Sequence, residues 1–122
     1  MVEKSSFLIV MGDSPKMRVL DFLLTYDVFD YSLSDIAENS GVGYTTLMEF
    51  WPSLIKTQIV EETRRVGRAR MFRINKKNPA VKLLSKLYWE ISKIGIRSTL
   101  KHQAKYSPLK INSEGYIKVL KR

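Results

Sequence analysis

Five arginines stand within ten residues on either side of a Val-Gly pair, and they form the first candidate binding site. They are Arg64, Arg65, Arg68, Arg70 and Arg73. A guanidinium is a planar fork of N–H donors that matches two phosphate oxygens at once, and it keeps its charge at every physiological pH. A tight turn that carries several of them can clamp a nucleic-acid backbone or enter a narrowed minor groove. We therefore expect the residues nearest the turn, Arg65 and Arg68, to contact DNA.

Some of these arginines have carboxylate neighbours, which offer a purely structural role. Glu61 and Glu62 lie in the same segment, and side chains on paired strands meet across a hairpin. About two of the five guanidiniums are expected to be held in this way, and at least about two to remain for DNA.

Five side chains between residues 44 and 49 form a second candidate site, because their types suit contacts with DNA. They are Tyr44, Thr45, Thr46, Met48 and Glu49. Hydroxyls bond to phosphates or bases, methionine contacts a thymine methyl group, and a carboxylate accepts from a cytosine amine. Thr46 has the alternative role of satisfying a free N–H at a helix start. No Lys or Arg lies between residues 44 and 53, so guanine recognition by arginine cannot come from this segment.

The residues needed for most catalytic and metal sites are missing. The 122-residue chain has no cysteine and a single histidine, His102, which stands among lysines. This excludes zinc-thiolate sites, iron-sulfur clusters and cysteine nucleophiles, and it disfavours a histidine metal cage or a catalytic triad. No phosphate-binding glycine loop or nucleophile motif occurs. We expect a protein that is not an enzyme and that has no cofactor and no metal.

Charge is divided unevenly along the chain and indicates an anionic partner. The net charge is +9, but residues 1–60 hold four cations and eight carboxylates (−4), whereas residues 61–122 hold 17 and four (+13). Solubility does not require such segregation, so nucleic acid is the favoured partner. No apolar run is long enough for a membrane helix or a signal peptide. A cytoplasmic, nucleoid-associated protein without a membrane partner is expected.

The second candidate site stands at the start of a helix that follows a glycine turn. Ser32 and Asp35 form a capping box that starts a short helix ending near residue 39. Gly41 suits the left-handed turn after a helix, and Gly43 suits the N-cap of the next helix, over residues 44–56. Two helices joined in this way form a helix-turn-helix.

Apolar positions predict which helix faces are buried. A helix that starts at Ser14-Pro15 carries a stripe broad enough to need covering on both sides. The stripe consists of Met17, Val19, Leu20, Phe22, Leu23, Leu24 and Val28. In the helix over residues 44–56, Pro52 is expected to cause a kink. Its buried face is expected to contain Leu47, Phe50, Trp51, Leu54 and Ile55. The first six residues of the chain are expected to form a mobile end.

The alternating segment over residues 59–74 predicts a β-hairpin that turns at Val66-Gly67. Asn78-Pro79 predicts the start of a long helix, and because Gly95 can either end this helix or lie within it, the position of its end stays open. Apolar residues of this helix recur at intervals of four and three, as in a helix packed against a partner helix. We expect a homodimer through this helix and the one from Ser14. The expected interface residues are Leu84, Leu87, Tyr88, Ile91 and Ile94.

The predicted fold is mainly α with a small β-hairpin (α+β). Its expected parts are an N-terminal segment (1–13), a helix-turn-helix with a hairpin (14–78), a C-terminal dimerisation helix (79–105) and a basic tail or small hairpin (106–122).

The order helix, helix, turn, helix, hairpin, helix resembles winged helix-turn-helix regulators of the ArsR and MarR families, over residues 14–94. The residues that carry the resemblance are Leu33-x-x-Ile36-Ala37-x-x-x-Gly41-Val42-x-x-x-Thr46-Leu47, Trp51-Pro52-x-Leu54 with Ile59-Val60, and Arg64-Arg65-Val66-Gly67-Arg68-Ala69-Arg70. The resemblance implies that the helix over 44–56 enters the major groove and that the hairpin, the wing, rests on the flanking backbone. It also implies that the C-terminal helix contributes to dimerisation.

These observations predict a sequence-preferring regulator of transcription that binds double-stranded DNA. Two alternatives stay open. One is an architectural or replication-associated protein that binds DNA with little sequence preference, which the sparse chemistry of residues 44–53 and the basic tail permit. The other is a winged helix that contacts protein or RNA through its arginines or through Phe50, Trp51 or Trp89. The sequence names no small-molecule effector.

Overall fold

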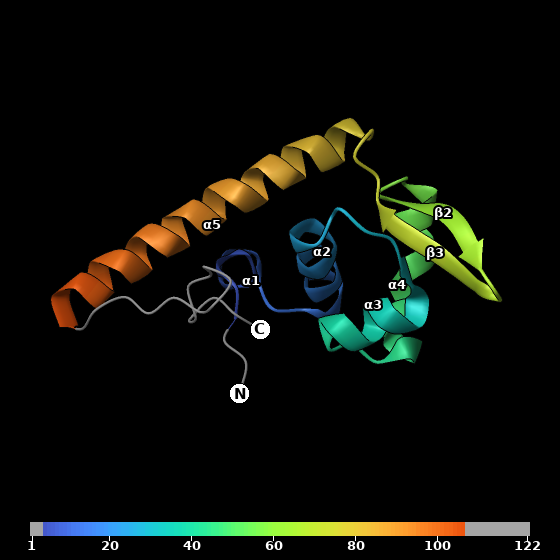
Figure 1. The fold of residues 1–122 in the computed structure, drawn as a ribbon, viewed down its shortest axis with the longest axis horizontal. Coiled ribbons are helices and arrows are strands. Elements are labelled where there is room, and N and C mark those ends of the chain that lie inside the picture. The colour runs from blue at the N-terminus through green and yellow to red at the C-terminus, as the bar shows by residue number, and fades with distance from the viewer. Residues whose placement is uncertain (1–3, 107–122) are drawn as a thin grey trace.

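The computed structural model describes residues 4–106, with side chains described for residues 4–96. Its elements are α1 (Ser6–Met11), α2 (Pro15–Thr25), β1 (Tyr31–Ser32), α3 (Leu33–Ser40), α4 (Tyr44–Lys56), β2 (Val60–Val66), β3 (Ala69–Ile74) and α5 (Pro79–Tyr106). The strands form one antiparallel sheet in the order β1-β3-β2. In Figure 1 the β2–β3 hairpin projects from one end of the helical body, and α5 extends past α1 at the other. The expected mainly helical fold with a small hairpin is confirmed.

The joints of the helix-turn-helix have the local structures that the sequence predicts. The hydroxyls of Ser14 and Ser32 cap α2 and α3, each accepting from the backbone N–H three residues later, at 3.3 and 3.1 Å. Gly41 takes a left-handed φ of 69° after α3, and Gly43 is the N-cap of α4. These caps begin and end the helices where the chain must turn, so α4 spans the predicted residues.

Helix α2 is the centre of the hydrophobic core, as its broad apolar stripe predicts. Val19, Leu23 and Leu24 are almost completely buried, and the helix packs against α1, α3, α4 and β3. The helix ends at Thr25, however, so the expectation that Val28 continues the stripe is wrong: this residue lies in the α2–β1 loop and is 71% exposed. The loop leads into β1, a short strand that the sequence does not indicate and that pairs with β3.

The short helix α1 is also not predicted, and its contacts show what holds it. Phe7 is fully buried and lies against Tyr88 of α5, with ring centroids 5.2 Å apart. The Ser5 hydroxyl caps α1 and donates to Asp21 of α2 at 3.0 Å. The expectation of a mobile end is therefore wrong for residues 4–6.

Helix α5 continues through Gly95 to Tyr106. At Gly95 it meets α1 closely, because a Cβ there would lie 1.8 Å from Oγ and 2.8 Å from Cβ of Ser6. The missing side chain thus lets the two helices pack together. In the described part of the chain, no helix combines the length and the apolar character that crossing a membrane requires. The expected tail or hairpin over residues 106–122 falls outside the described residues, apart from the last residue of α5.

The contact at Gly95 predicts that alanine at this position destabilises the protein, which is the opposite of its usual effect inside a helix. Alanine in place of glycine inside a helix ordinarily stabilises it by about 1 kcal/mol. Here the added Cβ meets a backbone-attached carbon of Ser6, and overpacking of this kind costs about 1–3 kcal/mol. We expect Gly95→Ala to lower the urea midpoint of unfolding, and the same change in a Ser6→Gly background to raise it. A higher midpoint for Gly95→Ala alone would contradict the close packing of α1 on α5.

Candidate nucleic-acid interface

The arginine-rich segment forms the predicted hairpin. β2 and β3 pair along their length, and Gly67 turns the chain with a φ of 62°, a conformation that glycine adopts without steric cost. Thr63 is an extra residue in β2, because the pairing register shifts between Glu62 and Arg64. Such a bulge bends its strand and increases the local twist, so it sets the direction of the outer half of the hairpin.

Three of the five arginines in the hairpin are held by carboxylates. The pairs are Arg64 with Asp30, Arg70 with Glu62 and Arg73 with Glu61, at N···O distances of 2.9, 2.7 and 3.0 Å. Strand spacing indicates the pairs with Glu61 and Glu62, but it cannot indicate Asp30, which precedes Arg64 by 34 residues. One more guanidinium is therefore held than the sequence suggests.

Arg65 and Arg68 differ from the other three. Both are exposed, and within residues 4–96 neither side chain takes part in an ion pair or a hydrogen bond. They stand at the tip of the hairpin, on either side of Gly67. Their guanidiniums keep all their donors for a ligand, as their position beside the turn predicts.

The ion pairs change the pKa values of the groups that form them. Hydrogen bonds from Arg64 and then from Thr63 hold the pKa of Asp30 far below its ordinary value. The hydrogen bond from Arg70 likewise lowers the pKa of Glu62. These carboxylates therefore stay charged at every pH near neutrality.

Helix α4 exposes the other predicted site only in part. Thr45 and Glu49 lie on its exposed face, and Tyr44 at its start is 51% exposed. Thr46 and Met48 are half-buried, and Met48 packs against the core. The structure therefore leaves Tyr44, Thr45 and Glu49 as the side chains of the first two turns that are most accessible to a partner.

The opposite face of α4 anchors it to the sheet. Leu47, Trp51 and Leu54 are buried, and the Trp51 ring meets Phe72 of β3 edge to face at 5.3 Å. Ile55, which is expected in this face, is instead 37% exposed. Trp51 is thus part of the core that fixes α4 relative to the hairpin.

Two lysines beside α4 are absent from the predicted sites. Lys56 follows Glu49 by seven residues, so it lies on the same exposed face, and helical spacing could have identified it. Lys16 of α2 is brought to the edge of α4, with its ammonium 5.9 Å from the centroid of the Phe50 ring. Only the packing of α2 on α4 reveals this position.

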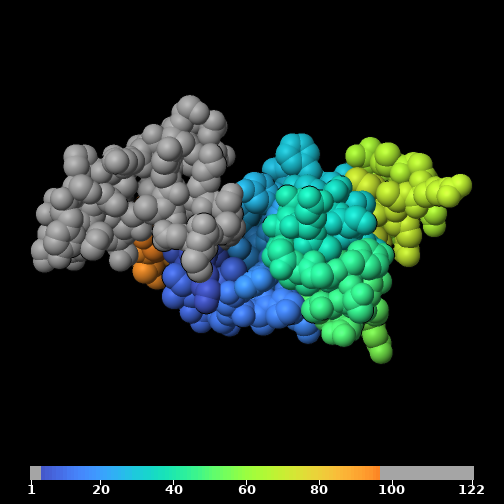
Figure 2. Space-filling view, turned by 90° about the horizontal axis from the view of Figure 1, so that it is seen from below, coloured from blue at the N-terminus to red at the C-terminus, as the bar shows by residue number. Residues whose placement is uncertain are grey.

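The exposed face of α4 and the hairpin occupy one end of the molecule. In Figure 2 the hairpin (yellow-green) projects beyond the surface of α3 and α4 (teal to green). Four cations that form no ion pair among the described residues lie at the hairpin tip and on or beside the exposed face of α4: Lys16, Lys56, Arg65 and Arg68. The exposed face of α4 carries one carboxylate, Glu49, and the neighbouring α3 adds the exposed carboxylates of Asp35 and Glu38. The four cations therefore suit contacts with a polyanion.

The predicted dimer residues of α5 divide between two faces. Tyr88 and Ile91 are buried within the chain, and Leu84 is partly buried against the same core. Leu87 and Ile94 are 44% and 59% exposed. The apolar residues of α5 that recur at intervals of four and three therefore belong to two different faces: an internal face that packs on α1 and an outer apolar stripe.

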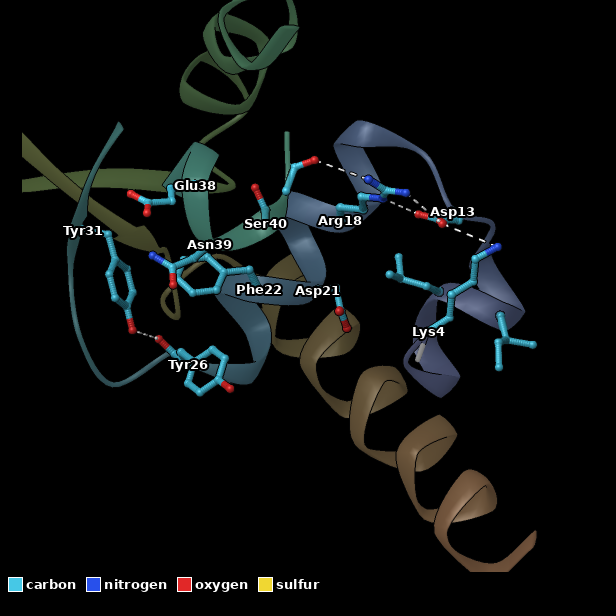
Figure 3. Close-up of a pocket in the computed structure, with 13 residues that line it drawn as sticks. Lys4, Asp13, Arg18, Asp21, Phe22, Tyr26, Tyr31, Glu38, Asn39 and Ser40 are labelled. Atoms are coloured by element: carbon cyan, nitrogen blue, oxygen red, sulfur yellow. Dashed lines mark hydrogen bonds and ion pairs between the residues drawn. The ribbon is translucent and has the colours of Figure 1, made fainter. Parts of the chain in front are cut away.

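A hollow of about 1190 Å³ lies elsewhere, between α1, α2 and α3. Figure 3 shows Arg18 on its wall, bound to both carboxylate oxygens of Asp13 and to the carbonyl of Gly41. These contacts tie α2 to the turn before α4, and Lys4 joins the same cluster at 3.5 Å. No group of three or more side chains suited to a metal ion occurs in the part of the chain that the structure describes.

The lowered pKa of Asp30 makes its contribution to stability depend on pH. A carboxylate whose pKa falls on folding stabilises the folded state above its unfolded pKa, near about 3.9, and this stabilisation is lost as the pH falls through the folded pKa. We expect Asp30→Asn to lower the free energy of unfolding by a constant amount between about pH 7 and 5, and by less below about pH 4. Urea titrations across this range measure the difference. A difference that stays constant into the acid range would contradict the ion pair.

Comparison with known proteins identifies the fold. No protein-family model matches the chain, and no curated protein matches it. Among solved structures, a transcriptional regulator of the MarR family from Silicibacter pomeroyi is similar, with a TM-score of 0.55 and 19% sequence identity over 83% of this chain. The match covers 64% of that regulator, so the chain spans less than two thirds of its length. The likeness that the sequence motifs suggest is thus confirmed for the fold, and the protein is a winged helix.

Proposed function

We propose that the protein is a regulator of transcription that binds double-stranded DNA, with α4 in the major groove and the tip of the wing on the flanking backbone or minor groove. The observation that carries the proposal is the division of the wing arginines, because among the described residues only Arg65 and Arg68, at the tip, form no ion pair with a carboxylate. A guanidinium without an internal partner gains most from a phosphate oxygen. The likeness to a MarR-family regulator supports the same reading.

Affinity and sequence preference would come from different elements in this arrangement. Arg65, Arg68, Lys16 and Lys56 supply contacts to phosphates, which carry no sequence information. The exposed residues of α4 are Tyr44, Thr45 and Glu49 in its first turns, and of these Glu49 can accept from a cytosine amine. Sequence preference would therefore rest on few base contacts, helped by the groove shape that the wing senses.

A homodimer is part of the proposal, through α1 and α5. Among residues 4–96, seven of the 13 large hydrophobic side chains that are exposed belong to these two helices: Ile9, Val10, Met11, Leu83, Leu87, Trp89 and Ile94. Leu83, Leu87 and Ile94 follow one another at intervals of four and seven, which places them in one stripe along α5. Helix α2, expected in the interface from the sequence, is covered by α1 instead. A two-fold dimer would place its α4 helices about 34 Å apart, on half-sites one helical turn apart.

The wing contacts predict a specific change in the salt dependence of DNA binding. Each phosphate contact adds about 0.9 to the slope of log affinity against log salt. We expect Arg65→Ala/Arg68→Ala to weaken binding to duplex DNA and to flatten this slope by about two units per protomer. Fluorescence anisotropy with a labelled duplex, across a salt series, measures both quantities.

The matched control is Lys82→Ala/Lys86→Ala, which removes the same charge from exposed lysines of α5 that form no ion pair with a described residue. If the control flattens the slope as much as the wing variant, the wing is not the clamp. If the wild type does not bind at about 50 mM salt, the DNA proposal fails. A preference for genomic over random duplex of less than about tenfold would favour the architectural alternative, since specific binders gain at least about a thousandfold.

The outer stripe of α5 predicts the effect of placing charge in it. We expect the wild type to have twice the chain mass of 14.2 kDa by light scattering, and Leu87→Glu/Ile94→Glu to have the mass of one chain, because two carboxylates would be buried at the interface. Lys16→Glu/Lys56→Glu, which places two carboxylates at exposed positions of α2 and α4 outside the proposed interface, is the control and should remain dimeric. A wild type with the mass of one chain would refute the dimer.

A further inference from the structure

The three ion pairs of the wing differ in what they connect. Glu61 and Glu62 belong to β2, so their pairs with Arg73 and Arg70 join the two strands of the hairpin to each other. These pairs move with the hairpin as a unit. Asp30 belongs to the loop between α2 and β1, so its pair with Arg64 joins the hairpin to the helical body.

The carboxylate of Asp30 is held at the bulge itself. It accepts two hydrogen bonds from Arg64, at 2.9 and 3.1 Å, and a third from the hydroxyl of Thr63. The Thr63 hydroxyl also lies 3.3 Å from the carbonyl oxygen of Met71 on the facing strand. One side chain of the body thus binds both the extra residue of β2 and the residue after it.

Beyond this point the hairpin stands alone. The pairing of β1 with β3 ends at Met71, and Arg64 is the residue opposite Met71 in β2. Among the described residues, no hydrogen bond or ion pair connects residues 65–70 with the helical body. Asp30 therefore stands at the last attachment before the free tip that carries Arg65 and Arg68.

We propose that Asp30 is a positioning residue for DNA binding: by fixing Thr63 and Arg64 at the bulge, it sets the direction in which Arg65 and Arg68 project relative to α4. The proposal rests on the proposed function, since it assumes that these two arginines contact DNA. A bulge converts a small local rotation into a larger displacement of the strand beyond it. Phosphate contacts by two elements at once require that both hold a fixed relative position.

The sign of the effect separates positioning from simple electrostatics. Asp30→Asn removes a negative charge and frees the guanidinium of Arg64, and both changes by themselves strengthen attraction to DNA. Positioning predicts the opposite result. We expect Asp30→Asn to weaken duplex binding by about fivefold and to flatten its salt slope toward that of Arg65→Ala/Arg68→Ala.

A double-mutant cycle tests whether Asp30→Asn changes DNA affinity through Arg65 and Arg68. In the Arg65→Ala/Arg68→Ala background, Asp30→Asn should no longer weaken binding, because the tip has no contact left to misplace. Asp27→Asn is the matched control: it lies in the same loop, removes the same charge and pairs with Lys76 at 3.5 Å, outside the strands. We expect its binding to equal or exceed that of the wild type. Urea midpoints confirm that each variant is folded at the assay temperature.

Three results would overturn the proposal. Unchanged or tighter binding by Asp30→Asn, in a protein whose wing variant loses affinity, would show that Asp30 does not position the tip and would leave the proposed function intact. If Asp30→Asn weakens DNA binding equally with and without Arg65 and Arg68, the substitution acts by disturbing the fold as a whole and not by misplacing the tip. Failure of the wild type to bind duplex DNA would overturn both this proposal and the proposed function, before any variant is compared.

Discussion

The apolar surface of α2 is too wide for one layer to cover, and most of the architecture follows from this constraint. Its six consecutive residues 19–24 are all buried, although they point in every direction around the helix. One side is covered by α3, α4 and β3, which places the helix-turn-helix and the hairpin together. The other side requires α1, and α1 in turn requires α5, through the contacts of Phe7 and Gly95. Burial of one central helix thus connects the two ends of the described chain.

A second constraint acts within the wing, because in the proposed complex with DNA carboxylates and phosphates compete for the same guanidiniums. An arginine that already binds a carboxylate must lose that bond before it binds DNA, so it contributes less affinity than a free one. The hairpin places its carboxylates near its base, at Glu61 and Glu62, and the body adds Asp30 at the bulge. The three arginines that bind these carboxylates therefore stiffen the hairpin, whereas Arg65 and Arg68 remain available. Neither residue type nor position along the strands alone explains this division, because Arg65 and Arg70 are opposite each other and only Arg70 binds Glu62.

Local signals in the sequence predict the elements well, because each depends on few neighbouring residues. The serine caps, the glycine after α3 and the start of α5 are of this kind, and so are the limits of α4. The features that the sequence does not reveal depend on distant partners. Phe7 makes α1 part of the core only because Tyr88 is there to receive it, and Asp30 has a role only because the fold brings it to Arg64. Gly95 suggests a helix end by propensity, but tertiary packing gives it a different purpose.

The candidate site also depends on contacts between distant residues that the sequence does not reveal, and these contacts decide which side chains a partner can reach. Residue types alone suggest that five arginines and five residues of α4 are equivalent contacts, yet burial and ion pairing reduce each group to a smaller accessible set. What remains is a helix with hydroxyls and one carboxylate, and a wing tip with two guanidiniums. In the proposed complex with DNA, neither part would recognise a sequence strongly by itself, because the first lacks affinity and the second lacks contacts with bases. Selectivity in that complex would then arise from their fixed spacing, since only a duplex whose grooves match this spacing can satisfy both at once.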